Sequence, residues 1–185
     1  ASDPQSYAIG IKELWEIDPS RHTPGFVMHT AGWPMDEHTY GGAFLYHAED
    51  NKVYCGYVVG LNYQNPHMSP FEEFQRWKTH PRVKWYFTDD AGKVNAKRLS
   101  YGARAITAGG VLALPKTVLP GGALVGCDAG YLNVSRIKGS HAAIKTGSLA
   151  GDAAYDAVAA GRQHDELTAY PEAFEHSWLA AELNK

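Results

Sequence analysis

The chain has few cysteines, little net charge and no long apolar run, and each shortage excludes a class of protein. Its 185 residues hold only 2 cysteines, Cys55 and Cys127, which excludes a disulfide framework or a four-thiolate cluster built by this chain alone. With 17 Lys and Arg against 20 Asp and Glu, the net charge of −3 gives no argument for nucleic-acid binding. No stretch approaches the roughly 18 apolar residues that a bilayer-spanning helix needs.

Motifs of several enzyme and metal-site classes are also missing. The 9 histidines show neither H-x-x-x-H nor H-E-x-x-H spacing, so we expect no metal site made by this chain alone. The G-x-S-x-G elbow of α/β-hydrolases and the G-x-G-x-x-G dinucleotide fingerprint are both absent. Cys127 is a poor nucleophile candidate, because the charge of Asp128 beside it disfavours the thiolate.

The first hundred residues are dominated by strand patterns. Apolar residues alternate with small or polar ones over 7–17, and 26–30 is a second short strand candidate. The segments 43–48 and 52–61 flank a polar turn at 49–51, which predicts an antiparallel hairpin. Strands that return on themselves in this way predict an antiparallel sheet.

One helix is predicted between Ser69 and Pro81. Ser69 is a good N-cap, Pro70 favours the first helical position and Glu72 completes a capping-box pattern. The aromatic residues on one face of this helix are Phe71, Phe74 and Trp77. We expect that stripe to pack on the sheet, with contact to lipid or to a partner as the alternative.

The second half of the chain predicts a short strand followed by helices. Residues 122–126 form an apolar run between glycines, read as a short buried strand, and Gly139-Ser140 opens a helix that stops near Gly161. A last helix is predicted over 166–183, with Pro171 as an early break or a second start. The small residues that would let the long helix lie close to a neighbour are Ala143, Gly147, Ala150 and Gly151.

Charge is polarised along the chain although its sum is small. Residues 76–104 carry 8 Lys or Arg against 2 Asp, whereas 151–185 carry 7 acidic residues against Arg162 and Lys185. A solvated face is the ordinary explanation for each half. An anionic ligand, a membrane surface or an acidic partner protein near the basic stretch is the alternative.

The run Gly126-Cys127-Asp128-Ala129-Gly130, followed by Ser140, has the order strand, acidic turn, loop and helix start. Its glycines allow close approach of the backbone to a ligand, and Asp128 can accept hydrogen bonds from ribose or ribityl hydroxyls. Free N–H groups at the helix start can face a phosphate or an electron-rich ring edge. The pattern therefore favours a dinucleotide site, against the alternative of an ordinary strand-to-helix turn.

A second cluster joins Gly32-Trp33-Pro34 to the run from Tyr40 through Gly41-Gly42 to His47. Paired glycines at a strand start leave backbone N–H and C=O groups unshielded, where a quinone carbonyl could bind while its ring stacks on an aromatic side chain. A plain turn or bulge is the alternative. His47 is a candidate proton donor or acceptor there, or a structural histidine.

Several long motifs resemble one family. The segments 40–47, 69–81, 101–105 and 120–127, together with the Ile137-Lys138-Gly139-Ser140-His141 helix opening, are similar to those of electron transfer flavoprotein–ubiquinone oxidoreductase, in the same order and at similar spacing. The resemblance extends from about Tyr7 to Glu182. Since the sequence begins at Ala1 and not at Met, we expect a piece of a longer protein.

The resemblance implies a monotopic enzyme, peripheral on the bacterial cytoplasmic or mitochondrial inner membrane. Such an enzyme carries FAD and a 4Fe-4S cluster, takes electrons from reduced electron transfer flavoprotein and reduces ubiquinone; no nucleic acid is involved. The cluster ligands are expected outside this chain, and the isolated piece is expected to be inactive. Two alternatives stay open: a sibling flavoprotein, such as a geranylgeranyl reductase-like enzyme or a nitrogen-fixation electron carrier, and an inert binding module.

Carried over position by position, the resemblance also implies the site residues. The quinone contacts it implies are Tyr40, Gly41 and Gly42. The flavin contacts it implies are Thr107, Asp128, Ala129, Gly130, Gly139 and Ser140. Many relatives have Ser at position 128 and Thr at position 140, so the carboxylate of Asp128 is a departure from the family, whereas Ser140 keeps a hydroxyl.

The expected fold class is α+β. Residues 1–104 are predicted to form a mainly antiparallel sheet with a covering helix, as in a ubiquinone-binding domain. Residues 105–185 are predicted to form the strand-turn-helix that closes an FAD-binding domain, plus a terminal helix. On this hypothesis the glycine pair at 41–42 and the corner at 128–140 converge on one cleft.

Overall fold

The computed structural model describes residues 2–185, and the chain divides into two compact units. The sheet unit comprises Ala8–Ala105, and the helical unit combines Ile106–Lys185 with the start of the chain up to Tyr7. The expected α+β class with a mainly antiparallel sheet is confirmed. Each unit is described below by itself.

The sheet unit is built on five strands in the order β2-β3-β4-β1-β5. Their bounds are β1 Tyr7–Glu16, β2 Val27–Ala31, β3 Gly41–His47, β4 Lys52–Gly60 and β5 Lys97–Thr107. The predicted hairpin is confirmed, because β3 pairs with β4 in antiparallel register. Asp50 and Asn51 in its turn both have positive φ, the geometry of the tight turns that match strand twist.

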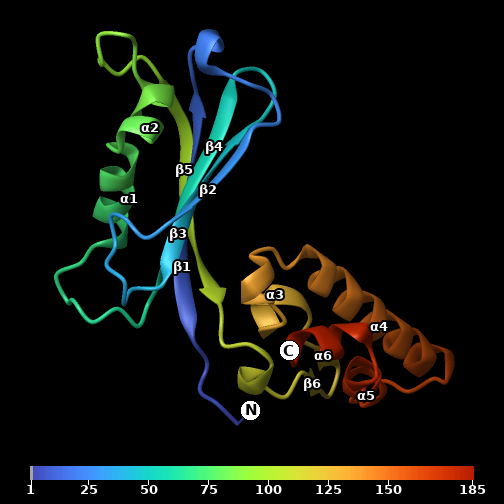
Figure 1. Cartoon of the computed structure of the whole chain (residues 1–185). Helices are drawn as coiled ribbons and strands as arrows, with labels where there is room; N and C mark the ends of the chain where they lie inside the picture. Colours follow the sequence, from blue (N-terminus) through green and yellow to red (C-terminus); the bar gives the residue numbers. More distant parts are fainter. Residues whose placement is uncertain (1) are drawn as a thin grey trace. The chain divides into compact units, whose positions relative to one another are not determined.

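Helix α1, Pro70–Lys78, covers one face of this sheet, and the short helix α2, Pro81–Lys84, follows on the same side (Figure 1). The predicted cap is confirmed: Ser69 Oγ accepts from the Glu72 N–H at 3.4 Å. Phe74 and Trp77 are buried on the sheet, but Phe71 is 45% exposed, so the stripe prediction is wrong for Phe71. Phe71 is displaced around the helix axis from Phe74 and Trp77, so it lies outside the face that contacts the strands.

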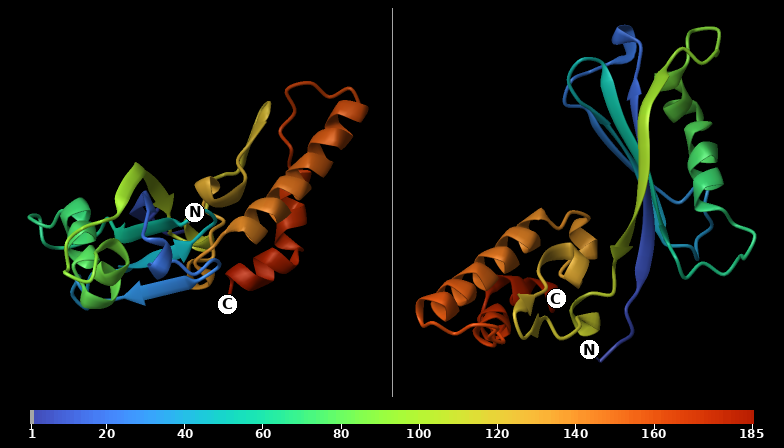
Figure 2. Two further views of the ribbon diagram at one scale, coloured as in Figure 1. Left: turned by 90° about the horizontal axis from the view of Figure 1, so that it is seen from above. Right: turned by 180° about the vertical axis from the view of Figure 1, so that it is seen from behind.

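The core of the sheet unit lies between α1 and the strand residues that face it. Its largest fully buried members include Leu45, Val53, Tyr57, Phe74 and Trp77. Two short 3₁₀ helices, Pro19–Arg21 and Trp85–Phe87, complete the unit. The view from behind in Figure 2 shows α1 and α2 on one side of the strands and no helix of this unit on the other.

The helical unit has its own core, formed by residues such as Tyr131, Ala142, Tyr170 and Leu179. Its longest element is α4, Ser140–Ala159, which stops just before Gly161 as predicted. Its other elements are β6 Val118–Leu119, β7 Gly122–Ala123, α3 Gly126–Ala129, α5 Ala169–Glu175, α6 Trp178–Leu183 and the 3₁₀ turns Val111–Ala113 and Val134–Arg136. Over residues 2–185, no helix has both the length and the apolar character needed to cross a bilayer.

Two element predictions in this unit are wrong. The buried strand predicted over 122–126 reduces to the two residues of β7, which pair with the two-residue β6, and Leu124 and Val125 are exposed. The single helix predicted over 166–183 is broken after Glu175, whereas Pro171 lies in the first turn of α5, where a missing N–H costs nothing, in agreement with the alternative of a second start there. A second helix, α6, then begins after Ser177, whose hydroxyl caps it by accepting from the Ala180 N–H.

Candidate functional site

The predicted flavin residues of the helical unit gather where α3 meets the start of α4. Asp128 and Ala129 lie inside the single turn of α3 and not in a turn after a strand, which corrects the expected strand-turn order. Gly130 ends α3 in the left-handed region at φ 109°. A Cβ placed at Gly130 would be 3.6 Å from Thr107 Cγ2, so the structure brings Thr107 to the end of α3.

The start of α4 is held tightly against α3. Gly139 is buried, and a Cβ at this position would overlap Cys127 Sγ. The Gly126 N–H donates to the buried Thr146 Oγ1 at 3.0 Å, which joins the first residue of α3 to the second turn of α4. Ser140 is exposed at the N-terminus of this 20-residue helix, whose cap residue makes no side-chain hydrogen bond.

This corner fits the edge of a planar, electron-rich cofactor. The first N–H groups of α4 have no acceptor within the helix and favour negative charge at this end. Small residues at positions 129, 130 and 139 keep side chains out of the way, while the hydroxyl of Ser140 and the exposed carboxylate of Asp128 supply polar contacts. The arrangement can therefore position a ligand ring and its hydroxyl-bearing chain without covalent chemistry.

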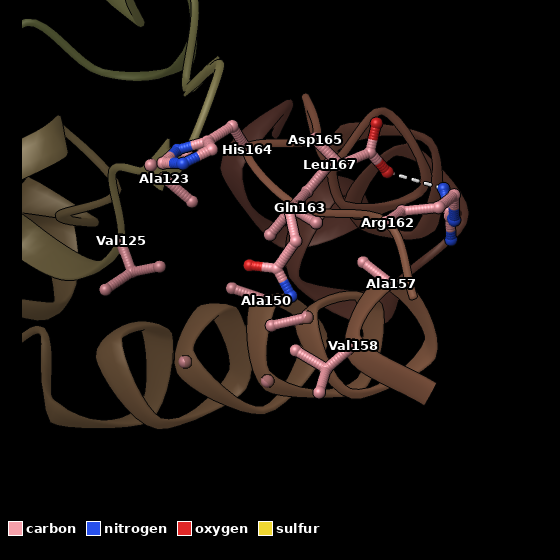
Figure 3. A pocket seen from close by; sticks show the side chains of 15 residues that line it. Ala123, Val125, Ala150, Ala157, Val158, Arg162, Gln163, His164, Asp165 and Leu167 are labelled. Atoms are coloured by element: carbon pink, nitrogen blue, oxygen red, sulfur yellow. Dashed lines mark hydrogen bonds and ion pairs between the residues drawn. The ribbon is translucent and has the colours of Figure 1, made fainter. Parts of the chain in front are cut away.

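A hollow of about 470 Å³ in the same unit lies away from this corner (Figure 3). It is walled by the β6–β7 hairpin, the middle of α4 and the loop before α5, where Arg162 pairs with Asp165. None of the predicted flavin residues lines it. The prediction that Gly147 and Gly151 allow close packing is wrong within residues 2–185, because a Cβ at either would meet nothing within 4 Å.

In the sheet unit, the predicted quinone residues lie at the start of β3. Gly42 pairs with Val58 of β4 on one side and with Ala31 of β2 on the other. A Cβ at Gly41 would overlap the Val58 carbonyl oxygen, and a Cβ at Gly42 would lie 2.5 Å from the Thr30 carbonyl oxygen. Backbone packing therefore requires glycine at both positions, independently of any ligand.

Tyr40 precedes the pair and is 57% exposed, so its ring is available to a planar partner. Its carbonyl accepts from the Gly60 N–H at 2.8 Å, which fixes the backbone next to the glycines. The structure thus places Tyr40, Gly41 and Gly42 in one short stretch of ordered backbone. A ring lying against it would meet an aromatic face and unshielded peptide groups.

The strand face opposite α1 bears a row of small residues that includes Gly42. The register places Gly10, Val58, Gly42 and Ala31 side by side across β1, β4, β3 and β2. The neighbouring row carries Phe44, whose ring lies over Gly56. We call this surface the open face of the sheet.

His47, a candidate proton donor by sequence, belongs to the other side of β3. It is 4% exposed, its Nδ1 accepts from the Thr23 N–H at 2.9 Å, and its ring stacks on His22 at 5.0 Å. The edges of Phe26 and Tyr86 close the cluster. Burial, helped by the charge of His22, lowers the pKa of His47 to about 4.

We expect this histidine to make the chain less stable as pH falls. The unfolded chain takes up a proton near pH 6.5, whereas folded His47 takes it up only near 4, so acidification favours unfolding across that window. The free energy of unfolding should fall by about 2–3 kcal/mol between these pH values. Urea titrations of wild type, His47→Gln and the control His67→Gln test this; an equal pH dependence in all three would contradict it.

Neither the Cys55 thiol nor a group of metal-ligating side chains gives a further candidate site among the described residues. Burial raises the pKa of the Cys55 thiol far above its ordinary range, so Cys55 stays protonated in the core. Among residues 2–185, no three His, Cys, Asp or Glu side chains are grouped closely enough to hold a metal ion.

Comparison with known protein families shows to which family the sheet unit belongs. Residues 7–106, more than half of the chain, match the ETF-QO ubiquinone-binding family. This chain belongs to that family. The matched residues include the glycine pair, the open face of the sheet and α1.

Relatives extend the likeness over nearly all of the chain. It is 57% identical over 183 residues to the electron transfer flavoprotein-ubiquinone oxidoreductase of Pseudomonas aeruginosa, covering 98% of this chain and 32% of the relative. It is 47% identical over 189 residues to the mitochondrial protein of that name from Rattus norvegicus, covering 98% and 30%. The chain therefore spans about a third of the length of these relatives.

Solved structures share the fold of this chain at low identity. A geranylgeranyl bacteriochlorophyll reductase-like protein from Thermoplasma acidophilum superposes with a TM-score of 0.68 at 14% identity, over 92% of this chain and 39% of that one. The flavin-dependent brominase Bmp2 gives a TM-score of 0.57 at 17% identity, over 95% and 41%. At these identities the likeness concerns the fold alone.

One polar pair on the open face was not predicted from the sequence. The Tyr46 hydroxyl lies 2.8 Å from His29 Nε2, and the two rings meet edge to face at 5.4 Å. The available signal was the strand alternation, which puts His29 and Ala31 on the same side of β2. It could not be used without the register that sets His29 opposite Phe44.

Proposed function

We propose that this chain is part of a membrane-bound oxidoreductase that passes electrons from reduced electron transfer flavoprotein, through FAD, to ubiquinone. The single observation that carries the proposal is the family match over the whole sheet unit, whose description names ubiquinone binding. The names of the bacterial and mitochondrial relatives supply the donor. Attachment would be peripheral, on the bacterial cytoplasmic or mitochondrial inner membrane.

FAD would be held by the corner of the helical unit. Bound there, FAD collects electrons singly and delivers them in pairs, which is the chemistry that quinone reduction needs. The chain's own contribution is electrostatic: the N-terminus of α4 and the Ser140 hydroxyl stabilise negative charge at the ring edge, and Asp128 orients the hydroxyl-bearing chain. Thr107, Ala129, Gly130 and Gly139 complete the contact surface.

The quinone ring would lie beside Tyr40 and the glycine pair. Gly41 and Gly42 present backbone to the ring, which fixes its orientation and the position of its carbonyl groups. We assign residues 1–104 to the quinone domain and 105–185 to the closing part of the FAD domain. With only two cysteines here, the ligands of the 4Fe-4S cluster would lie in the rest of the parent protein.

The test fills the open face beside the glycine pair without changing either glycine. Ala31→Trp puts a large ring next to Gly42 from an exposed position, and the control Leu99→Trp puts the same ring at an exposed position of β5, the opposite edge strand of the sheet. In the full-length enzyme, Ala31→Trp should lower ubiquinone reduction at least tenfold, while reduction of the flavin by its donor stays unchanged. The control should keep both activities.

Two results would contradict the proposal. One is unaltered quinone reduction in Ala31→Trp. The other is a full-length wild-type enzyme, loaded with FAD, that reduces a one-electron dye but no quinone.

A further inference from the structure

We propose that His29 and Tyr46 form a proton relay that serves the quinone bound beside Gly42. The inference rests on the function proposed above and assigns a role to two residues that the family resemblance did not single out. It starts from a hydrogen bond: Tyr46 Oη and His29 Nε2 are 2.8 Å apart, across the pair of strands β2 and β3.

The register places this pair on the same face as Gly42. Thr30 faces α1, since its Oγ1 accepts from Trp77 Nε1 at 2.9 Å, so its neighbours His29 and Ala31 point to the open face. Ala31 is the partner of Gly42, and His29 follows two residues away, about 7 Å along the strand. A histidine side chain, alone or through one water, spans such a distance.

Neighbouring rings hold the pair in place. Phe44 stacks on Tyr46 at 4.7 Å, and its ring occupies the space over Gly56, where any Cβ would overlap it. Tyr46 is thereby fixed on one side by Phe44 and on the other by His29. Within residues 2–185 only Nε2 of His29 is engaged in a hydrogen bond, so Nδ1 is the nitrogen that can face a substrate.

Quinone reduction consumes protons, which such a group can deliver. A quinone becomes a quinol by gaining two electrons, here from the reduced flavin, and two protons, one on each carbonyl oxygen. His29 Nδ1–H gives one proton to the nearer oxygen, Nε2 takes the hydroxyl proton of Tyr46, and the Tyr46 oxygen recovers a proton from solvent. Exchange of the imidazole tautomer through water restores the pair, so charge and atoms balance.

Histidine suits this task because a neutral imidazole can donate a proton from one ring nitrogen while it accepts one at the other. The second proton can reach the other carbonyl directly from water, since His29 itself lies on an exposed strand. The pair is therefore expected to control the rate of proton delivery and not the affinity for quinone.

The experiment uses the full-length, FAD-loaded enzyme with its flavoprotein donor. The variants are His29→Gln and Tyr46→Phe, and the matched control is Tyr54→Phe, a tyrosine on the same face. Two acceptors are compared: a short-chain ubiquinone, which takes protons, and ferricyanide, which takes none.

We expect His29→Gln to lower kcat with quinone by roughly 10²-fold, the low end of general acid catalysis, with KM within twofold of wild type. Ferricyanide reduction should be unchanged. Tyr46→Phe should lower kcat with quinone by a smaller factor and shift the pH profile of quinone reduction. The solvent isotope effect on kcat should differ from that of wild type in both variants. Tyr54→Phe should resemble wild type.

Equal losses with both acceptors, or full quinone activity with an unaltered pH profile in His29→Gln and Tyr46→Phe, would overturn the relay while leaving the proposed function intact. A wild-type enzyme that reduces ferricyanide but no quinone would overturn both.

Discussion

Gly41→Ala is expected to unfold the sheet unit or to leave it severely destabilised. The new Cβ would overlap the Val58 carbonyl oxygen and lie 2.5 Å from Met35 Cε, at the first residue pair of the β3–β4 ladder. A backbone oxygen in a ladder cannot move aside as the end of a side chain can. We expect a loss of at least about 3 kcal/mol in the free energy of unfolding, measured by urea denaturation of this chain.

The matched control is Gly102→Ala. Gly102 lies in β5 of the same sheet, and a Cβ there would meet nothing within 4 Å. That variant should be as stable as wild type or slightly more so, because alanine reduces the entropy of the unfolded chain. A Gly41→Ala protein that unfolds at the wild-type urea concentration would show that the strand pair relaxes easily and that glycine is not required there.

This expectation changes how the glycine pair can be studied. Loss of quinone reduction in a Gly41 or Gly42 variant would follow from disrupted pairing as readily as from a lost quinone contact. Variants at Ala31 and His29 avoid the ambiguity, because both side chains project from the exposed edge of the pairing. They probe the ligand and leave the backbone of β3 as it is.

Much of the fold could be predicted from the sequence because local chemistry determines it. The Asp50-Asn51 turn fixes the hairpin, Ser69 with Pro70 fixes the start of α1, and Gly161 marks the end of α4. These signals act within a few residues. Where the outcome depended on how much neighbouring structure covers a segment, as at Leu124 and Val125, the prediction of burial failed.

The candidate sites were predictable in composition but not in geometry. The short motif around Asp128 reads as a turn, yet packing of Gly126 against Ala143 and the bond to Thr146 wind it into helix α3. The contact of Thr107 with the end of α3 joins positions more than twenty residues apart. His29 and Tyr46 meet only through the register of β2 and β3, which no local pattern contains.

Glu13→Ala is expected to cost about 3–5 kcal/mol, because it leaves buried charge without a partner. Glu13 is 1% exposed, and its carboxylate accepts from Lys78 Nζ at 2.5 Å, Trp15 Nε1 at 2.8 Å and Arg98 at 3.2 Å. Although burial opposes ionisation, these bonds hold the pKa of Glu13 below its ordinary value. The carboxylate therefore ties α1 to β1 and β5.

A double variant that removes the charges of both Glu13 and Lys78 tests whether the loss in Glu13→Ala comes from the unpaired charge that it leaves. Glu13→Leu combined with Lys78→Met replaces the ions by apolar groups of similar size and should recover most of the stability lost in Glu13→Ala. Glu16→Ala, on the exposed end of the same strand, should change little. Equal urea midpoints for Glu13→Ala and Glu16→Ala would contradict the expectation.

Because of the Glu13 carboxylate, we expect the free energy of unfolding to fall at acidic pH in wild type, by a step that the double variant lacks. Because the folded pKa of Glu13 lies below that of the unfolded chain, its contribution is complete above the unfolded value of about 4.5 and is lost as pH falls through the folded value. His47 removes stability in the window just above. Wild type should therefore lose stability in two steps on acidification, and Glu13→Leu with Lys78→Met only in the upper one.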